Sequence, residues 1–192
     1  MNTGLRQNNE YAFHALAIDE HRKAFLPTLW TNEGATQAKP RAIDRTEQRW
    51  FVGAHANVGG GCFDDPLGQI PLQWIEGKAT TLGLTFKTQF MPQENAVTAP
   101  ISDSFAEFAW GLYRLFRLGI RYNRPIGLPP INEGEGVKII NETIDSSVFN
   151  RWRADPSYRP RSLRNWTKNK NINPTKILRS VRSDDPTVVV DD

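Results

Sequence analysis

The chain has 192 residues, 39% of them hydrophobic and 23% charged, a composition that supports one folded domain and excludes global disorder. Its single cysteine, Cys62, excludes an intrachain disulfide and any zinc site built on several thiolates. No uncharged apolar stretch reaches the roughly 18–20 residues of a membrane span, and the polar N-terminus has no signal-peptide core. We therefore expect a protein of a reducing compartment that has no transmembrane segment.

The net charge of +3 is distributed unevenly along the chain. Residues 151–182 contain ten Lys or Arg and one acidic residue, whereas residues 1–150 contain 14 basic and 16 acidic residues. The last ten residues add four Asp. The basic character of the protein therefore comes from one C-terminal segment and says little about the remainder.

The first element predicted from the apolar pattern is a helix over residues 9–23, with Asn9 as its N-cap. We expect this helix to end before Pro27, because the residue before a proline avoids helical geometry. The positions on its apolar face would be Tyr11, Ala12, Ala15, Leu16 and Ile18.

Residues 48–53 are mostly bulky β-forming residues and predict a buried strand. That strand runs into Gly53-Ala-His55, and three consecutive glycines follow at residues 59–61. Residues 66–82 then predict a helix with one apolar side, in which Pro71 is tolerated only in the first turn.

Residues 103–118 predict another helix whose apolar positions run nearly all the way round. It is either a core element, which we favour, or a lipid-facing lid. Residues 137–153 predict a short strand followed by a helix. Beyond Pro156 the chain has the composition of an extended basic tail.

A histidine at the carboxyl end of a strand lies where open α/β sheets place their functional sites. Imidazole is the usual general base near neutral pH, because its unperturbed pKa lies in that range. Flanking glycines would let a substrate or another loop approach the ring of His55. The same pattern also describes a capped or packed histidine, so the pattern alone leaves both interpretations open.

Three blocks of residues occur in a fixed order and spacing. They are Tyr11-Ala-Phe-His-Ala-Leu-Ala-Ile-Asp-Glu-His-Arg22, Phe25-x-Pro-x-Leu-Trp30 and Trp50-Phe-x-Gly-x-His-x-Asn-Val-Gly-Gly-Gly61. Together they resemble the α/β-hydrolase-like catalytic domain of the type VI secretion phospholipase effectors and their uncharacterised relatives. The resemblance covers residues 8–90 and, more loosely, residues 140–165, which contain Asp155-Pro-x-Tyr158-x-Pro160.

The resemblance implies a serine-hydrolase triad in the chain order Ser, Asp, His, with His55 at the position of the triad histidine. His55 would deprotonate the nucleophile and then protonate the leaving group. The family's nucleophile lies on a Gly-x-Ser-x-Gly turn ahead of these blocks, but this sequence has no such motif and its first serine, Ser102, follows His55. We therefore expect the C-terminal half of the domain, arising from a truncated reading frame, a split gene or a degenerate copy.

Two positions depart from the family pattern. Relatives usually have Ser-Asp after the histidine, where this chain has Ala56-Asn57, and an aromatic residue is commoner at Cys62. Loss of that carboxylate would remove a partner that fixes the local geometry, so both departures argue against full activity. A thiol–imidazole pair between Cys62 and His55 would need hydrogen-bond reach across three glycines, and we do not favour it.

Asp19 and Glu20 with His14 and His21 have the residue types of a metal or acid–base cluster. The two histidines would lie two turns, about 10.5 Å, apart on the predicted helix, too far for one metal ion. Asp19 could instead orient His55, although the family's acid comes from elsewhere. We favour a structural role in which Asp19 and Glu20 cap, pair with or anchor the following loop.

The predicted fold is α/β, a partial α/β-hydrolase-like sheet with flanking helices and an irregular basic C-terminal tail. Residues 1–161 would form the C-terminal portion of the hydrolase-like domain, and residues 162–192 an irregular, poorly ordered tail. Trp152, Tyr158 and Trp166 among the arginines would suit anionic lipid or nucleic acid. A solvated tail is the commoner explanation, and no nucleic-acid-binding motif accompanies the basic residues.

The leading functional hypothesis is a fragment of a serine esterase or phospholipase-like domain that supplies His55 and is inactive alone. The alternative is a degenerate, non-catalytic protein that binds lipid or a partner through its basic tail and aromatic surface. The expected partners are a phospholipid or ester substrate, and a missing N-terminal half or separate chain. We expect no cofactor, metal or nucleic acid. The protein would be cytoplasmic, or secreted by a route without a signal peptide.

Overall fold

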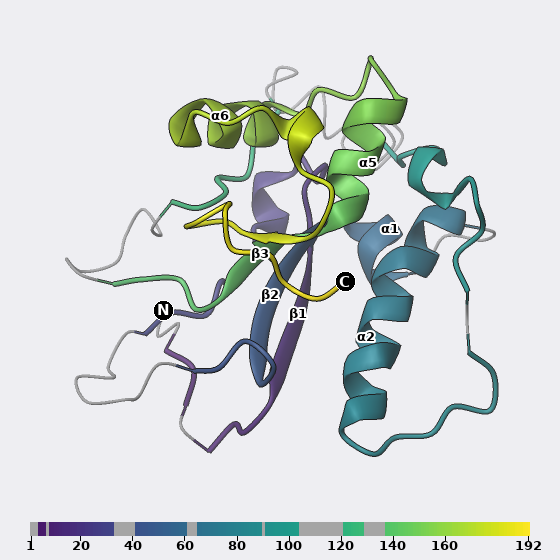
Figure 1. The fold of residues 1–192 in the computed structure, drawn as a ribbon, viewed down its shortest axis with the longest axis vertical. Helices are drawn as coiled ribbons and strands as arrows, with labels where there is room; N and C mark the ends of the chain where they lie inside the picture. The colour runs from purple at the N-terminus through teal and green to yellow at the C-terminus, as the bar shows by residue number, and fades with distance from the viewer. Residues whose placement is uncertain are drawn as a thin grey trace.

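A computed structural model describes residues 4–6, 8–32, 41–60, 65–89, 91–103, 121–128 and 137–192. The elements of these residues, with η for short 3₁₀ helices, are β1 (Ala12–Ala17), η1 (Lys23–Phe25), β2 (Thr46–Phe51), α1 (His55–Gly59), η2 (Pro66–Gly68), α2 (Gln69–Thr81), η3 (Ala96–Thr98), β3 (Glu142–Ile144), α5 (Ser146–Ala154), α6 (Arg161–Lys170), η5 (Pro174–Lys176) and β4 (Val181–Arg182). Figure 1 shows α2 running alongside the sheet, with α5 and α6 toward the end at which the parallel strands finish.

The strands of the described chain form one sheet in the order β1-β2-β3-β4. β1, β2 and β3 are parallel, with Ala17 opposite Phe51 and Trp50 opposite Ile144, and β4 is antiparallel to β3. The carboxyl ends of the three parallel strands therefore meet at one edge of the sheet. This mixed sheet with flanking helices confirms the predicted α/β class.

The helix predicted over residues 9–23 is wrong, because the chain forms β1 there. Neighbouring side chains of β1 point to opposite faces of the sheet. Phe13 packs edge-to-face on Trp74 of α2, whereas the ring of His14 lies 5.1 Å from that of Trp30. A short apolar run fits both a helical and a strand period, and parallel pairing with β2 decides between them here.

The other predicted elements agree better with the structure. The strand expected at residues 48–53 is β2, which begins and ends two residues earlier, and every one of its residues is buried. The helix expected over residues 66–82 is η2 followed by α2, with Pro71 in the first turn. The strand and helix expected within residues 137–153 are β3 and α5, and Asp145 caps α5 by accepting from the backbone of Ser147.

Buried charges link β2 to the elements on both of its sides. Arg49, fully buried, donates to Glu47 at 2.8 Å and to Asp145 at 3.3 Å, and it also donates to the backbone carbonyl of Asp191. Lys78 of α2 lies 2.9 Å from the second oxygen of Glu47. Each charge therefore has an opposite partner, which offsets the cost of removing it from water.

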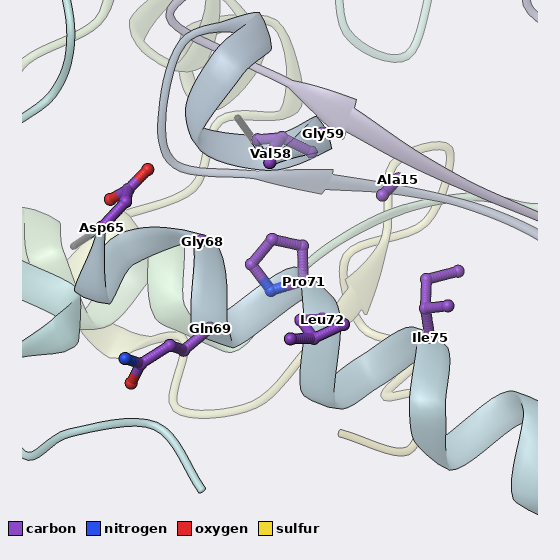
Figure 2. A pocket seen from close by; sticks show the side chains of 10 residues that line it. Ala15, Val58, Gly59, Asp65, Gly68, Gln69, Pro71, Leu72 and Ile75 are labelled. Carbon is purple, nitrogen blue, oxygen red and sulfur yellow. The ribbon is translucent and has the colours of Figure 1, made fainter. Parts of the chain in front are cut away.

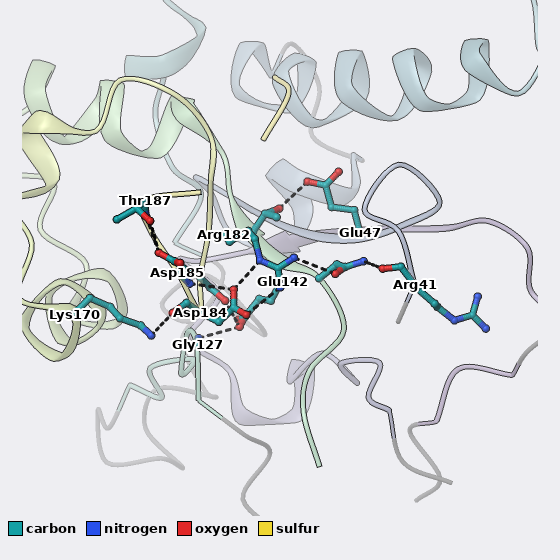
Figure 3. Close-up of polar contacts among 12 residues, drawn as sticks. Arg41, Glu47, Gly127, Glu142, Lys170, Arg182, Asp184, Asp185 and Thr187 are labelled. Atoms are coloured by element: carbon teal, nitrogen blue, oxygen red, sulfur yellow. Dashed lines mark hydrogen bonds and ion pairs between the residues drawn. The ribbon is translucent and has the colours of Figure 1, made fainter. Parts of the chain in front are cut away.

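The irregular tail expected over residues 162–192 is also wrong, because this segment contains α6, η5 and β4. Leu163 and Trp166 are 0% and 1% exposed, and the Trp166 indole donates to the carbonyl of Ser183 at 2.8 Å. The hydroxyl of Ser183 in turn donates to Glu142 of β3 at 2.6 Å, in the network of Figure 3. The exposed basic residues lie on the outward side of α6 and the apolar residues on its inward side. The segment is therefore an amphipathic helix, although its average composition is that of a polar tail.

Some predicted features lie outside the described residues. These are Gly61, Cys62 and the aromatic helix predicted over residues 103–118, of which only Asp103 is described. Among the helices that the structure describes, none is long and apolar enough to cross a membrane.

Trp166→Ala tests whether the C-terminal segment belongs to the core. The substitution should lower the free energy of unfolding by about 3–5 kcal/mol, because it removes a buried aromatic side chain. Urea unfolding followed by circular dichroism measures the change. Asn165→Ala, at an exposed position of the same helix, is the matched control and should change stability by less than about 0.5 kcal/mol. Equally small effects for both variants would show that the segment is a separate tail.

Candidate active site

His55 lies at the edge of the sheet where the parallel strands end. It is the first residue of α1, four residues after the end of β2, and its side chain is exposed. The ring of Phe25 meets the imidazole edge-to-face at 5.2 Å between centroids. Within the described ranges no side chain hydrogen-bonds the imidazole, so its nitrogens are available to other groups.

Three consecutive backbone amides lead into His55, and a different side chain accepts from each. Gly53 donates to the carboxylate of Asp19 at 2.8 Å, Ala54 donates to the amide oxygen of Asn57 at 3.0 Å, and His55 donates to Glu20 at 3.4 Å. Asp19 and Glu20 follow β1, so the end of one strand holds the turn that leaves the next. The backbone position of His55 is thereby fixed.

Gly53 is required at the start of this turn. Its φ is +119°, a conformation that side chains of L-residues rarely adopt. A Cβ atom at this position would lie 2.7 Å from the Cβ of Asn57. The close approach lets the Asn57 side chain reach back to the amide of Ala54.

Asp19 joins β1 to β2 and to the C-terminal segment. The oxygen that accepts from Gly53 also accepts from the hydroxyl of Tyr158 at 3.1 Å. Burial raises the pKa of Asp19 to about 6, against the opposing effect of these two hydrogen bonds. Asp19 therefore anchors the turn, and it binds these two groups rather than the imidazole of His55.

Glu20 fixes the aromatic neighbour of His55. Its carboxylate accepts from the Arg22 guanidinium at 2.9 and 2.8 Å and from the Arg22 backbone at 2.8 Å. The same guanidinium lies 3.8 Å from the ring centroid of Phe25. Phe25 in turn contacts His55, so the pairing and anchoring role expected for Asp19 and Glu20 is confirmed.

The comparison with protein families addresses this same region. Residues 1–78 match the family model of the T6SS phospholipase effector Tle1-like catalytic domain. The match confirms the resemblance predicted from the three motifs. It spans β1, η1, β2, α1 and most of α2, and so includes His55 and the side chains that hold its backbone. No curated protein and no solved structure matches the chain.

Asn57 occupies the position at which the family resemblance predicts an aspartate. Its amide nitrogen donates to Asp65 at 2.9 Å and to the hydroxyl of Ser102 at 3.2 Å. Its oxygen accepts from the backbone of Ser102 at 3.1 Å as well as from Ala54. The amide therefore fixes the local geometry that the missing carboxylate was expected to fix, and its donors suit the neighbouring Asp65.

The two other histidines have separate contacts. His14 lies in β1 beside Trp30, and burial lowers its pKa. The Nδ1 atom of His21 lies 3.1 Å from the backbone carbonyl oxygen of Tyr122. No group of three His, Cys, Asp or Glu side chains arranged for a metal ion occurs in the part of the chain that the structure describes.

A groove of about 440 Å³ runs between α1, α2 and β1. Figure 2 shows Pro71, Leu72 and Ile75 of α2 along one side and Val58 of α1 across from them. Asp65 and Gln69 add polar groups at one end. The groove reaches α1 only three residues beyond His55, but the imidazole does not line it.

Sequence reasoning missed two residues that support this edge. Tyr158 belongs to a motif of the family resemblance, Asp155-Pro-x-Tyr158, but nothing in the sequence indicates its contact with Asp19. Arg124, buried, donates to the backbone carbonyl of Ala17 at 2.7 Å and to that of Phe25. No pattern in the sequence distinguishes Arg124 from other arginines, because it lies outside every helix and strand that the sequence predicts.

The pKa of Asp19 predicts a pH-dependent stability. Because this pKa is about 6 in the fold and 3.8 ordinarily, the folded chain keeps a proton at pH 4–6 that the unfolded chain releases. Stability therefore falls as the pH rises through this window, by about 3 kcal/mol in all. Asp19→Asn, which keeps a neutral acceptor, should gain stability relative to the wild type between pH 4 and pH 7, as measured by urea unfolding.

Asp185→Asn is the control for this pH series. Asp185 is exposed, and hydrogen bonds from Thr187 lower its pKa. Its removal should cost stability at pH 7 and cost less at acid pH, the opposite trend. A difference between Asp19→Asn and the wild type that stays constant with pH would contradict the prediction for Asp19.

Asn57→Asp would place a second carboxylate against Asp65. The variant loses the donor of the 2.9 Å bond and adds like-charge repulsion, so it should destabilise the fold by about 1–3 kcal/mol at pH 7. The double variant Asn57→Asp with Asp65→Asn exchanges the two groups and should recover most of this loss. Chemical unfolding of the three proteins measures it, and equal stability of the single variant and the wild type would refute the role given to Asn57.

Proposed function

We propose that this chain supplies the catalytic base of a phospholipase-like serine hydrolase, with His55 as that base. The observation that supports this most is the presentation of His55, exposed at the carboxyl end of β2 on a turn held by three side chains. The match of residues 1–78 to a phospholipase effector family supports the reaction class. The same match favours secretion through the type VI system.

The proposed chemistry is acyl transfer from an ester to a serine. The imidazole of His55 would take the proton of the serine hydroxyl while the serine oxygen attacks the ester carbonyl, and would then give that proton to the departing alcohol. Water, activated by the same imidazole, would release the fatty acid. The edge contact with Phe25 restrains the ring, and the apolar groove beside α1 offers a surface for an acyl chain.

We further propose that the serine and the acid of the site come from a segment outside these 192 residues. The sequence has no Gly-x-Ser-x-Gly motif, and in the described region no carboxylate binds the imidazole. β1 is an edge strand of the described sheet, and an edge strand offers unpaired backbone groups to a further strand. The chain alone would then be inactive.

Addition of the proposed second segment tests this function. We expect the 192-residue chain to show no turnover of a short-chain p-nitrophenyl ester, because it lacks the nucleophile. Mixed or co-expressed with the N-terminal half of a related catalytic domain, it should gain an activity that a serine-directed fluorophosphonate abolishes. In that complex His55→Ala should lower the rate by several orders of magnitude, since triad members act as a unit.

His21→Gln is the matched control in the completed domain. His21 also follows β1 at this edge, but its contact is with a backbone carbonyl, so the variant should keep near-normal turnover. Near-normal hydrolysis by His55→Ala would refute the proposed base. Fluorophosphonate-sensitive turnover by the chain alone would refute the proposed second segment.

A further inference from the structure

The outward face of α6 is a fixed array of positive charges. Arg161, Arg164 and Lys168 are all exposed and recur at helical spacing. In the part of the chain that the structure describes, none of the three side chains forms an ion pair or a hydrogen bond. They are therefore available to an anionic partner.

The inward face of the same helix holds these charges in place. Leu163 and Trp166 are buried, and Asn171 closes the helix in a left-handed conformation. A charged face on a packed helix loses less conformational freedom on binding than a flexible basic tail would.

In the described part of the chain, the acidic residues that follow α6 in the sequence have other partners. Residues 156–183 contain no Asp or Glu. Asp184 is paired with Arg182 at 2.9 Å, and Asp185 accepts from Thr187. Lys170, at the end of α6, donates to the backbone of Asp184, so the acidic turn lies beside that end of the helix (Figure 3).

The chemistry of the face favours a lipid surface over single-stranded nucleic acid. Single-stranded nucleic acids bind by stacking bases on exposed aromatic rings. Here Tyr158 and Trp166 are buried, and the guanidinium of Arg159 covers the ring of Trp152 at 4.2 Å. The aromatic residues that accompany the arginines in the sequence therefore do not lie on the basic face.

We propose that α6 docks the protein on an anionic phospholipid bilayer through Arg161, Arg164 and Lys168. The helix begins three residues after Tyr158, which contacts Asp19 at the edge of the sheet that carries His55. Docking through α6 would bring that edge toward the lipid. The choice of a lipid partner rests on the proposed function, but binding to vesicles requires neither His55 nor hydrolysis.

Co-sedimentation of the full chain with vesicles tests the proposal. Vesicles of phosphatidylcholine with phosphatidylglycerol should bind the protein at low salt, and vesicles of phosphatidylcholine alone should not. The triple variant Arg161→Gln, Arg164→Gln, Lys168→Gln should bind the anionic vesicles about 100-fold more weakly. Raising the salt concentration should weaken wild-type binding, because it screens exposed charges.

The matched control removes three exposed charges at the opposite end of the sheet. Arg6, Arg45 and Lys138 precede β1, β2 and β3. The variant Arg6→Gln, Arg45→Gln, Lys138→Gln has the same net charge as the α6 triple variant and should bind like the wild type. Urea unfolding of both variants confirms that each is folded.

Three results would overturn the proposal. They are equal loss of binding by both triple variants, equal binding to vesicles with and without phosphatidylglycerol, and displacement of the protein from vesicles by a short duplex DNA that binds it more tightly. His55→Ala should bind vesicles like the wild type. A wild-type completed domain that binds anionic vesicles but hydrolyses no ester would count against the proposed function alone. A completed domain that hydrolyses ester but does not bind anionic vesicles would count against the docking face alone.

Discussion

One carboxylate oxygen of Asp19 determines how the carboxyl edge of the sheet is built. It accepts from the Gly53 backbone after β2 and from the Tyr158 hydroxyl after α5. Without these bonds a buried amide and a buried hydroxyl would both lack a partner, which costs more than the bonds themselves contribute. Folding must in return bury a carboxylate, and this burial raises the pKa of Asp19. The turn that presents His55 and the C-terminal segment are therefore held by the same group.

A second buried network lies at the middle of β2. Arg49 binds Glu47 and Asp145, and Lys78 brings α2 to Glu47. Removal of one member would leave an unpaired buried charge, so the network favours one arrangement of β2, β3 and α2 over others. Because Arg49 also binds the backbone of Asp191, the end of the described chain packs against the central strand.

The sequence correctly predicts those elements whose buried positions are consecutive or regularly spaced apolar residues. β2 and α2 are of this kind. β1 was mistaken for a helix because Tyr11, Ala15 and Ile18 fit a helical face, and only pairing with β2 shows that successive side chains alternate. The contact between Asp19 and Tyr158 joins residues 139 positions apart, a distance over which periodicity carries no information. The position of His55 after a strand could be predicted, but the side chains that hold its backbone could not.

The error over α6 has a more general physical cause. Net charge averaged along a segment does not depend on helical period, whereas burial depends on it entirely. Arg161, Arg164 and Lys168 share one side of the helix, and Leu163 and Trp166 share the other. The same ten residues therefore complete the core and form a charged surface. Because the two faces use different residues, substitution of the outward charges can change binding to an anionic surface while the inward side chains keep the fold intact.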